Sequence, residues 1–246
     1  MAWLWPLISP PEDYAEEARY WIDALRETIG PGDVRILELG VGGGDNLSHI
    51  VGDHGDMVVS ACAVDLSEGM LAHSRKLNPS VAHYVGDMRS VRLRDESGGV
   101  STFDAVLIHD AVSYLLSEDD ITRTFDTVRV HLRPGGVLII APDWYRETFH
   151  PPVFSEDTRS DDDTEVTMLS TEFDSDPSDT VMEVAFTFEI RESGRLRIEE
   201  DQHEMGLFPV DTWVRSMERA GFAVQLRPFP VHADGRDAWL ITGVRS

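Results

Sequence analysis

Two kinds of hydrophobic pattern alternate along the first 145 residues. Short apolar runs bounded by polar or glycine-rich stretches predict buried strands at residues 34–39, 58–64, 81–85, 103–108 and 137–141. Apolar residues at helical spacing predict helices at residues 12–29, 46–51, 68–77 and 119–132. Strands that alternate with helices in this way favour a mostly parallel sheet covered by helices on both faces.

The pattern changes after residue 145. Residues 155–179 are rich in Asp and Glu and show little periodicity, which predicts a solvated loop. Three β-like segments lie in or after this stretch, and they predict an antiparallel insertion at residues 165–173, 180–191 and 195–205. A helix at 210–220 and strands at 222–228 and 238–244 are expected to close the chain. The whole pattern predicts an α/β fold with seven strands in the main sheet, the last one antiparallel, and a small β insertion after strand five.

The charge balance narrows the range of partners. The chain has 45 acidic residues against 21 basic ones, a net charge of −24, so nucleic acid is not expected as a partner. No apolar run approaches the roughly 20 residues needed to span a bilayer, so no membrane partner is expected either. Residues 1–8 are apolar but short and lack a basic start, which favours an arm packed on the body over a signal peptide.

Cysteine and acidic residues give no indication of a metal site. The single cysteine, Cys62, lies in an apolar run and is expected to be a small buried hydrophobe. This cysteine usage is consistent with a reducing cytoplasm, where we expect the protein to be located. The acidic cluster at 161–163 lacks the spacing of calcium ligands and is expected to be solvated.

The most informative segment is residues 36–45, where an apolar strand leads into a glycine-rich turn and then a helix. Glycines let the backbone approach a ligand closely and adopt positive φ. A dinucleotide fingerprint would need a third small residue where this chain has Asp45. Here the glycines are Gly40, Gly42 and Gly44, and the acidic Glu38 precedes them.

This form resembles the first motif of the class I, Rossmann-like, S-adenosylmethionine-dependent methyltransferases. Three further segments follow in the order that the family shows: Asp65-Leu66-Ser67, Gly86-Asp87-Met88, and the loop 132–136 before strand five. The resemblance implies that Asp65 accepts hydrogen bonds from both ribose hydroxyls and that Asp87 accepts one from the adenine amine. Two local alternatives stay open, a helix N-cap for the segment that begins at Asp65 and a turn residue for Asp87.

S-adenosylmethionine is therefore the expected cofactor. The full set of residues that the resemblance assigns to it is Tyr14, Glu38, Gly40, Gly42, Gly44, Asp65, Leu66, Met70, Asp87, Met88 and His109. Leu66 and Met88 would cover the faces of the adenine ring. His109 would contact the methionine part through its backbone or side chain, although a polar strand end is an equal alternative. For Tyr14 the alternative is a place in the apolar stripe of the first helix.

The same resemblance predicts a single methyltransferase domain, 1–246. Within it we expect an N-terminal arm and helix at 1–30 and a cofactor-binding core at 33–144. An acidic loop and antiparallel lid are expected at 145–208, and a C-terminal helix and hairpin at 209–246 would complete the sheet. The oligomeric state is left open, with a homodimer as one option.

Several scattered segments resemble bacterial N-methyltransferases that dimethylate the amine of nucleotide-linked deoxysugars. They are residues 13–18, 86–89, 112–115, 143–149 and 182–187. The resemblance implies a small-molecule acceptor, such as an amino sugar or another secondary metabolite, and the choice between nitrogen and oxygen stays open. The chain departs from that group at His109-Asp110-Ala111, where those enzymes are typically serine-rich, so the acceptor need not be the same.

Two residues are predicted to act on the acceptor. An amine must be neutral and a hydroxyl must lose its proton before it attacks, and a general base adds typically about 10²- to 10⁴-fold. His203 in the insertion is the predicted base or acceptor-positioning residue, and Tyr114 is predicted to line the acceptor pocket. A surface histidine and a core aromatic are the respective alternatives. At the level of function the alternatives are a catalytically silent S-adenosylmethionine-binding protein and a nicotinamide-dependent oxidoreductase.

Overall fold

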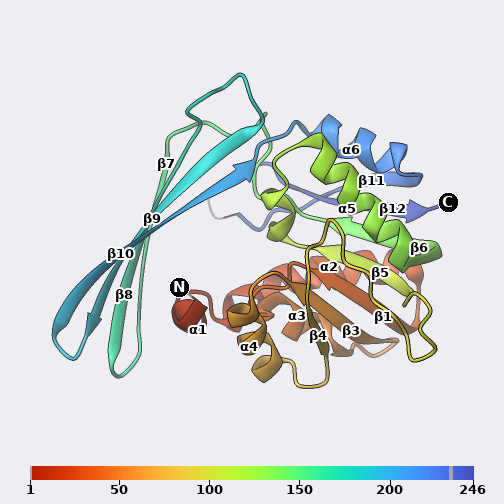
Figure 1. The fold of residues 1–246 in the computed structure, drawn as a ribbon, viewed down its shortest axis with the longest axis horizontal. Coiled ribbons are helices and arrows are strands. Elements are labelled where there is room, and N and C mark those ends of the chain that lie inside the picture. The colour runs from red at the N-terminus through yellow and green to blue at the C-terminus, as the bar shows by residue number, and fades with distance from the viewer. Residues whose placement is uncertain (1, 233–234) are drawn as a thin grey trace.

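The computed structural model describes residues 2–232 and 235–246, which form two sheets and their helices (Figure 1). The large sheet has eight strands in the order β11-β12-β6-β5-β1-β3-β2, and β4 also pairs with β3. Its strands are β1 (Gly32–Leu39), β2 (Gly52–Asp53), β3 (Met57–Asp65), β4 (Ala82–Val85), β5 (Phe103–Ile108), β6 (Leu132–Ile140), β11 (Phe222–Pro228) and β12 (Trp239–Arg245). The helices are α1 (Trp5–Ile8), α2 (Ala15–Ile29), α3 (Asp45–Ile50), α4 (Glu68–Leu77), α5 (Glu118–His131) and α6 (Val210–Arg219), with 3-10 turns η1 (Ala2–Leu4), η2 (Pro11–Tyr14) and η3 (Asp110–Tyr114).

Strands β1, β3, β4, β5 and β6 run parallel, and β12 is antiparallel to β6. Alternate side chains of each strand enter separate cores on the two faces of the sheet. Ile36 packs with α2, α3 and α4 on one face, whereas its neighbour Leu37 packs with α5 and α6 on the other. Trp21 of α2 and Trp213 of α6 are fully buried at the centres of these cores. The predicted α/β class, with helices on both faces and an antiparallel last strand, is confirmed.

The number of strands in the large sheet was predicted wrongly, since there are eight and not seven. The additional strand, β2, has two residues and pairs antiparallel with β3, so it is too short to leave a hydrophobic pattern. The expected loop at 132–136 is also wrong in part. Strand β6 begins at Leu132, which pairs with Phe103 before a register shift.

The small sheet has four antiparallel strands in the order β10-β9-β8-β7 and extends to one side of the large sheet (Figure 1). Its strands are β7 (Val153–Ser160), β8 (Thr164–Phe173), β9 (Val181–Glu192) and β10 (Arg195–Gly206). The predicted solvated loop at 155–179 is wrong for β7, whereas β8 matches the strand predicted at 165–173. From Ser155 onward strand β7 has only polar side chains and is held by its main-chain pairing to β8, so its sequence shows no alternation.

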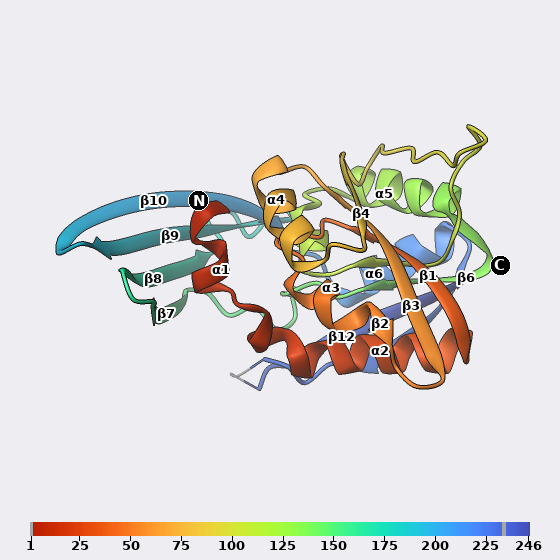
Figure 2. The same cartoon turned by 90° about the horizontal axis from the view of Figure 1, so that it is seen from below.

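The N-terminal arm packs between the two sheets. Leu4 is buried against Val166, Phe188 and Ile190 of the small sheet, and the Cβ of Ala2 lies close to Gly69 of α4. Figure 2 shows α1 between the small sheet and α4. The expectation that the apolar opening residues pack on the body is confirmed. Within residues 2–232 and 235–246, no helix combines the length and the apolar character needed to cross a membrane.

Candidate functional site

The turn after β1 has a backbone conformation that glycine adopts readily. Gly40, Gly42 and Gly44 have positive φ angles of 77°, 56° and 80°. A Cβ atom on Gly40 would lie 2.3 Å from the Cβ of Ala111, and one on Gly44 would lie 2.2 Å from the Oγ of Ser74. The turn is therefore packed against η3 and α4 with no room for a side chain at Gly40 or Gly44, and its bare backbone can approach a ligand.

Asp65, the last residue of β3, holds this turn in place. One carboxylate oxygen accepts a hydrogen bond from the Gly42 N–H at 2.8 Å, and the other accepts one from the Ser67 N–H at 2.8 Å. The N-cap of α4 is Ser67, whose hydroxyl accepts from the Met70 N–H at 3.2 Å. Each carboxylate oxygen can accept a further bond, so Asp65 retains acceptor positions for hydroxyl donors.

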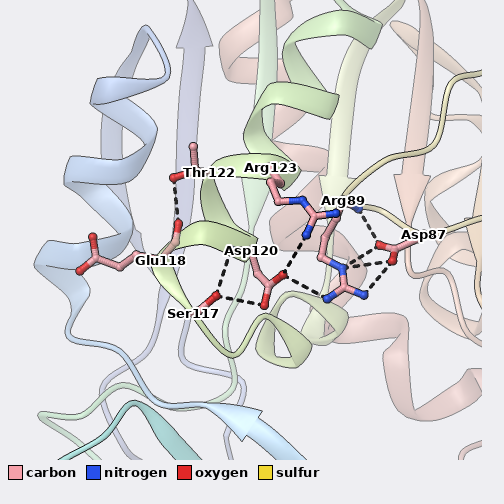
Figure 3. A network of polar contacts seen from close by, with 7 residues as sticks. All are labelled: Asp87, Arg89, Ser117, Glu118, Asp120, Thr122 and Arg123. Carbon is pink, nitrogen blue, oxygen red and sulfur yellow. Dashed lines mark hydrogen bonds and ion pairs between the residues drawn. The ribbon is translucent and has the colours of Figure 1, made fainter.

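Asp87 lies beside Asp65 because β3 and β4 are neighbouring parallel strands, and the Gly86 N–H donates to the Asp65 carbonyl at 3.0 Å. Its carboxylate accepts hydrogen bonds from Arg89 Nε at 3.0 Å and Nη2 at 2.7 Å (Figure 3). These bonds hold the pKa of Asp87 below its ordinary value, so the group is ionised. Asp87 also accepts the Arg89 N–H at 2.8 Å, so it has the turn role that was the local alternative, while its contact with adenine stays a prediction.

Apolar side chains flank the turn and the two carboxylates. The Cε atoms of Met88 and Met70 lie 3.5 Å and 3.7 Å from where Cβ atoms would stand on Gly40 and Gly42, respectively. Leu66 is 66 % exposed, which is high for so large an apolar side chain. These three side chains are available to cover a flat ring held by Asp87.

Glu38 on β1 is buried beneath the turn. Its Oε2 atom has no hydrogen-bond partner in the described part of the chain. Burial, together with the nearby Asp110 and Asp65, raises its pKa to about 8, although His109 opposes the shift. An unpartnered buried carboxylate is a natural acceptor for a cationic amine.

His109, at the end of β5, has both ring nitrogens engaged. Its Nε2 is paired with Glu17 of α2, and its Nδ1 lies 2.9 Å from Asp110 Oδ1. Burial alone would lower its pKa, but the two carboxylates outweigh burial and raise it well above the ordinary value. His109 is thus a charged imidazolium whose side chain is committed to protein partners, which leaves its backbone for the predicted methionine contact.

Tyr14 of η2 lies on the same cluster. Its hydroxyl is 2.5 Å from the Ser9 hydroxyl, and its ring meets the ring of His109 edge-on with centroids 6.2 Å apart. Burial, followed by the charge of Asp110, raises its pKa, so the hydroxyl keeps its proton. Tyr14 is therefore a neutral donor or acceptor close to Glu17 and Asp45, and it is more than a member of an apolar stripe.

Tyr114 and His203, the two residues predicted to act on the acceptor, meet across the two sheets. The Tyr114 hydroxyl of η3 lies 2.6 Å from Nδ1 of His203 on β10. The Nε2 of His203 faces Asp201 Oδ2 at 3.6 Å, and Phe186 packs edge-on against the imidazole at 5.2 Å. Tyr114 remains 45 % exposed. It is not a core aromatic.

Carboxylates surround this pair. Burial and then the charges of Asp110, Asp143 and Asp201 raise the pKa of the Tyr114 hydroxyl, so it stays protonated. Asp143, which follows β6, is fixed by its N–H donating to Ser113 Oγ at 3.2 Å. Burial and the neighbouring Asp110 raise the pKa of Asp143 to about 7. The region around Tyr114 therefore has a negative potential that favours a cationic or hydrogen-donating acceptor.

Three contributors to the site were not identified from the sequence: Trp5, Glu17 and Arg89. The indole N–H of Trp5 donates to Asp45 at 2.7 Å, and its ring leaves no space for a Cβ on Gly43. Nothing in the sequence links Glu17 to His109, since the pair is formed by packing of α2 on the sheet. Arg89, two residues after Asp87, is the one that local sequence could have indicated.

The residues at this edge of the sheet fit an adenosyl cofactor. A glycine turn without side chains is followed by two carboxylates on neighbouring strands, and an orphaned carboxylate lies beneath it. These groups match ribose hydroxyls, an adenine amine and a cationic amine. In the described part of the chain, no group of three or more His, Cys, Asp or Glu side chains could hold a metal ion.

Comparison with known proteins agrees with this geometry. Residues 37–138 match the model of a family described as a methyltransferase domain. The chain is 32% identical over 216 residues to a dTDP-3-amino-3,4,6-trideoxy-α-D-glucopyranose N,N-dimethyltransferase of Streptomyces venezuelae, covering 87% of this chain and 85% of the relative. It is 25% identical to a dTDP-3-amino-3,6-dideoxy-α-D-glucopyranose N,N-dimethyltransferase of Streptomyces fradiae, covering 88% and 80% of the two chains.

Solved structures show the same architecture. The crystal structure of Streptomyces venezuelae DesVI aligns with a TM-score of 0.79 at 28% identity, covering 95% of this chain and 92% of that chain. The S-adenosylmethionine-bound structure of CalS10, an amino pentose methyltransferase from Micromonospora echinaspora, shares the fold with a TM-score of 0.76 at 22% identity and the same coverage. The chain thus belongs to the Rossmann-like S-adenosylmethionine-dependent methyltransferases and is similar to those named as sugar N-methyltransferases.

Proposed function

We propose that this enzyme transfers methyl groups to the amine of a small molecule in the class of nucleotide-linked amino sugars. Two relatives named as dTDP-amino-sugar N,N-dimethyltransferases support the substrate class. The observation that carries the proposal is the 2.6 Å contact between the Tyr114 hydroxyl and His203 Nδ1, which forms a proton-accepting pair in a carboxylate-lined site.

The cofactor would be held at the edge formed by β1, β3 and β4. Asp65 would accept the ribose hydroxyls, Asp87 the adenine amine, and Glu38 the cationic amine of the methionine part. When bound, S-adenosylmethionine supplies an electrophilic methyl group on a sulfonium. The chain itself supplies a site from which water is excluded and orients the cofactor and the acceptor. This alignment lowers the activation barrier of methyl transfer.

Tyr114 and His203 would handle the acceptor proton. The Tyr114 hydroxyl donates its proton toward His203 Nδ1, so its oxygen lone pair faces outward and accepts an N–H bond from the acceptor. This bond aims the nitrogen lone pair away from Tyr114. As the new C–N bond forms and the bond between the methyl carbon and the sulfonium sulfur breaks, the nitrogen proton would pass to Tyr114 Oη and the tyrosine proton to His203. Asp201 Oδ2, 3.6 Å from His203 Nε2, would stabilise the resulting positive charge.

The charges around Tyr114 favour nitrogen over a carboxylate as the acceptor. Asp110, Asp143 and Asp201 would repel a carboxylate as the reacting group of the acceptor and would attract an ammonium. Asp143, with its pKa of about 7, is a second group able to take a proton from an ammonium that arrives protonated.

The proposal also assigns roles to the parts of the chain. Residues 33–144 would hold the cofactor, and residues 145–208 would supply one wall of the acceptor site through β10. The arm and helix at 1–30 would lie over the glycine turn, and 209–246 would complete the sheet. A cytoplasmic location is part of the proposal, and the one cysteine, Cys62, is free and buried as expected for a reducing compartment.

The test is an acceptor comparison with the purified protein. Release of S-adenosylhomocysteine is measured with a dTDP-3-amino-6-deoxysugar and with its 3-hydroxy counterpart, and mass spectrometry of the product counts the methyl groups. Turnover with the amine and none with the alcohol is expected. Methylation of the alcohol alone would replace nitrogen with oxygen as the target. Absence of turnover across both compounds, despite binding of S-adenosylhomocysteine, would favour the catalytically silent alternative.

A further inference from the structure

We infer that Arg89 and Asp120 form a positioning pair that orients the Asp87 carboxylate, and that this pair makes the cofactor site selective for a 6-aminopurine. The inference rests on the proposed function, because it takes Asp87 to be the adenine contact. It concerns residues outside the glycine turn, on the loop after β4 and on the first turn of α5.

The guanidinium of Arg89 is divided between two carboxylates (Figure 3). Nε and Nη2 hold Asp87, and Nη1 donates to Asp120 Oδ1 at 3.1 Å. The side chains of Asp87 and Asp120 are only 27% and 17% exposed, and that of Arg89 is 34% exposed. A planar guanidinium presents its donors in fixed directions, so one arginine fixes the orientation of both carboxylates.

Asp120 is itself anchored to a rigid element. Ser117 is the N-cap of α5, and its hydroxyl accepts the Asp120 N–H and donates to Asp120 Oδ2, both at 3.1 Å. Oδ1 is then left for Arg89, and Arg123 approaches the same oxygen at 4.0 Å. The long side chain of Arg89 thus connects Asp87, on an irregular loop, to a helix packed in the core.

This connection matters because residues 86–102 contain no helix and no strand longer than an isolated bridge. Without the Arg89 side chain, the Asp87 carboxylate would keep only its hydrogen bond from the backbone N–H of residue 89. The two carboxylates would also keep only the more distant Arg123, 4.0 Å from Asp120 Oδ1, as a neighbouring cation in a chain of net charge −24. Both effects predict that loss of Arg89 disorganises the acceptor at the adenine position.

An ionised carboxylate only accepts hydrogen bonds. It therefore pairs with the 6-amino group of adenine and opposes the 6-oxo group of hypoxanthine. A hydrogen bond to a charged group is strong enough to discriminate by about tenfold to a hundredfold. The ratio of the two affinities reports the orientation and charge of Asp87, whereas a general loosening of the fold would weaken both ligands alike.

The experiment is calorimetric titration of the full chain with S-adenosylhomocysteine and with S-inosylhomocysteine, its 6-oxo analogue. The wild type should prefer the amine by about tenfold to a hundredfold. Arg89→Met keeps much of the apolar stem and should reduce this preference to about threefold or less. Arg89→Lys should give an intermediate value, because a point charge holds one carboxylate well but not both. Asp120→Asn should reduce the preference in the same direction and by less.

The matched control is Arg215→Met, which removes the same charge from an exposed arginine-aspartate pair on α6 with an Nε to Oδ2 distance of 3.1 Å. It should leave the preference unchanged. Thermal melting of each variant checks folding, and Asp120→Asn carries the test if Arg89→Met does not fold.

Two results separate this inference from the function on which it rests. If the wild type binds neither ligand, or if Asp87→Asn leaves the preference intact, the adenine assignment and the proposed function are wrong at that position. If Asp87→Asn abolishes the preference but Arg89→Met and Asp120→Asn both retain it, the positioning pair is overturned and the adenine assignment stands.

Discussion

The two halves of the site are built in different ways. The cofactor half is formed by strand ends that are close in sequence, as in the bond between Gly42 and Asp65, which are 23 residues apart. The acceptor half joins η3 at the edge of the large sheet to β10 of the small sheet, with Tyr114 and His203 separated by 89 residues. The first half depends on backbone geometry, and the second depends on how two sheets pack.

This difference indicates where each half can change. The glycine turn tolerates little substitution, because a Cβ at Gly40 or Gly44 would clash with packed side chains and Gly42 has a positive φ. The acceptor half is made of exposed or half-exposed side chains on separate elements. Asp110 illustrates this arrangement, since its side chain is 49% exposed and its charge acts on Tyr114.

The largest effect is expected in the acceptor half. His203→Ala should lower turnover by about 10²-fold or more, because it removes the final proton acceptor. Tyr114→Phe removes only the hydroxyl and should act in the same direction. Both variants should bind S-adenosylhomocysteine within about twofold of the wild type, which calorimetry measures.

Tyr20→Phe is the control for Tyr114→Phe, since the Tyr20 ring packs on Phe229 away from the site. Its turnover should match that of the wild type. A wild-type turnover rate in His203→Ala would show that His203 is a surface histidine with no role in the reaction. It would also contradict the assignment of Tyr114 and His203 as the acceptor half.

Asp65→Ala should have the next largest effect, confined to the cofactor half. It removes the predicted ribose acceptor and the bond that fixes Gly42, so the affinity for S-adenosylhomocysteine should fall by about a hundredfold. Asp53→Ala is a matched control, because Asp53 also accepts a backbone N–H at 2.8 Å, from Gly55. Calorimetry that shows equal affinities for Asp65→Ala and the wild type would exclude Asp65 as a cofactor contact.

The smallest expected effect is the pH dependence that Glu38 gives to S-adenosylhomocysteine affinity. It sharpens the comparison between the two halves of the site most. With a pKa of about 8 the group is mostly protonated at neutral pH in the free protein, but it must be ionised to bind a cationic amine. Affinity for S-adenosylhomocysteine should therefore rise by up to about tenfold per pH unit until about pH 8 and then level off. In Glu38→Gln this slope should be absent.

The same residue predicts a stability profile. Its folded pKa of about 8 exceeds its ordinary value of 4.5, so the folded state binds the Glu38 proton more tightly than the unfolded state. The stability contribution is complete below the unfolded pKa and is lost as the pH rises through about 8. Urea unfolding of the wild type and Glu38→Gln across this range measures it, and parallel curves would contradict the raised pKa.

Much of the fold was predictable because buried strands and amphipathic helices leave strong patterns. The helix 68–77 and the strand 103–108 have the predicted bounds. Strand β7 was not predictable, since a polar edge strand is stabilised by main-chain hydrogen bonds that any sequence can make. In the candidate site, the positions of Gly40 and Gly42 in a turn and of Asp65 and Asp87 after neighbouring strands were predictable, because strand ends and turns are local features.

The sequence by itself determined the parallel sheet, the glycine turn and the order of the carboxylates after its strands. These follow from short-range rules, namely hydrophobic periodicity and the conformational freedom of glycine. Only the tertiary structure decided that Tyr114 meets His203, that Arg89 joins Asp87 to Asp120, and that Glu38 is left without a partner. These contacts depend on long-range packing of whole elements, and no local pattern encodes the distance between two side chains that meet only when the sheets have docked.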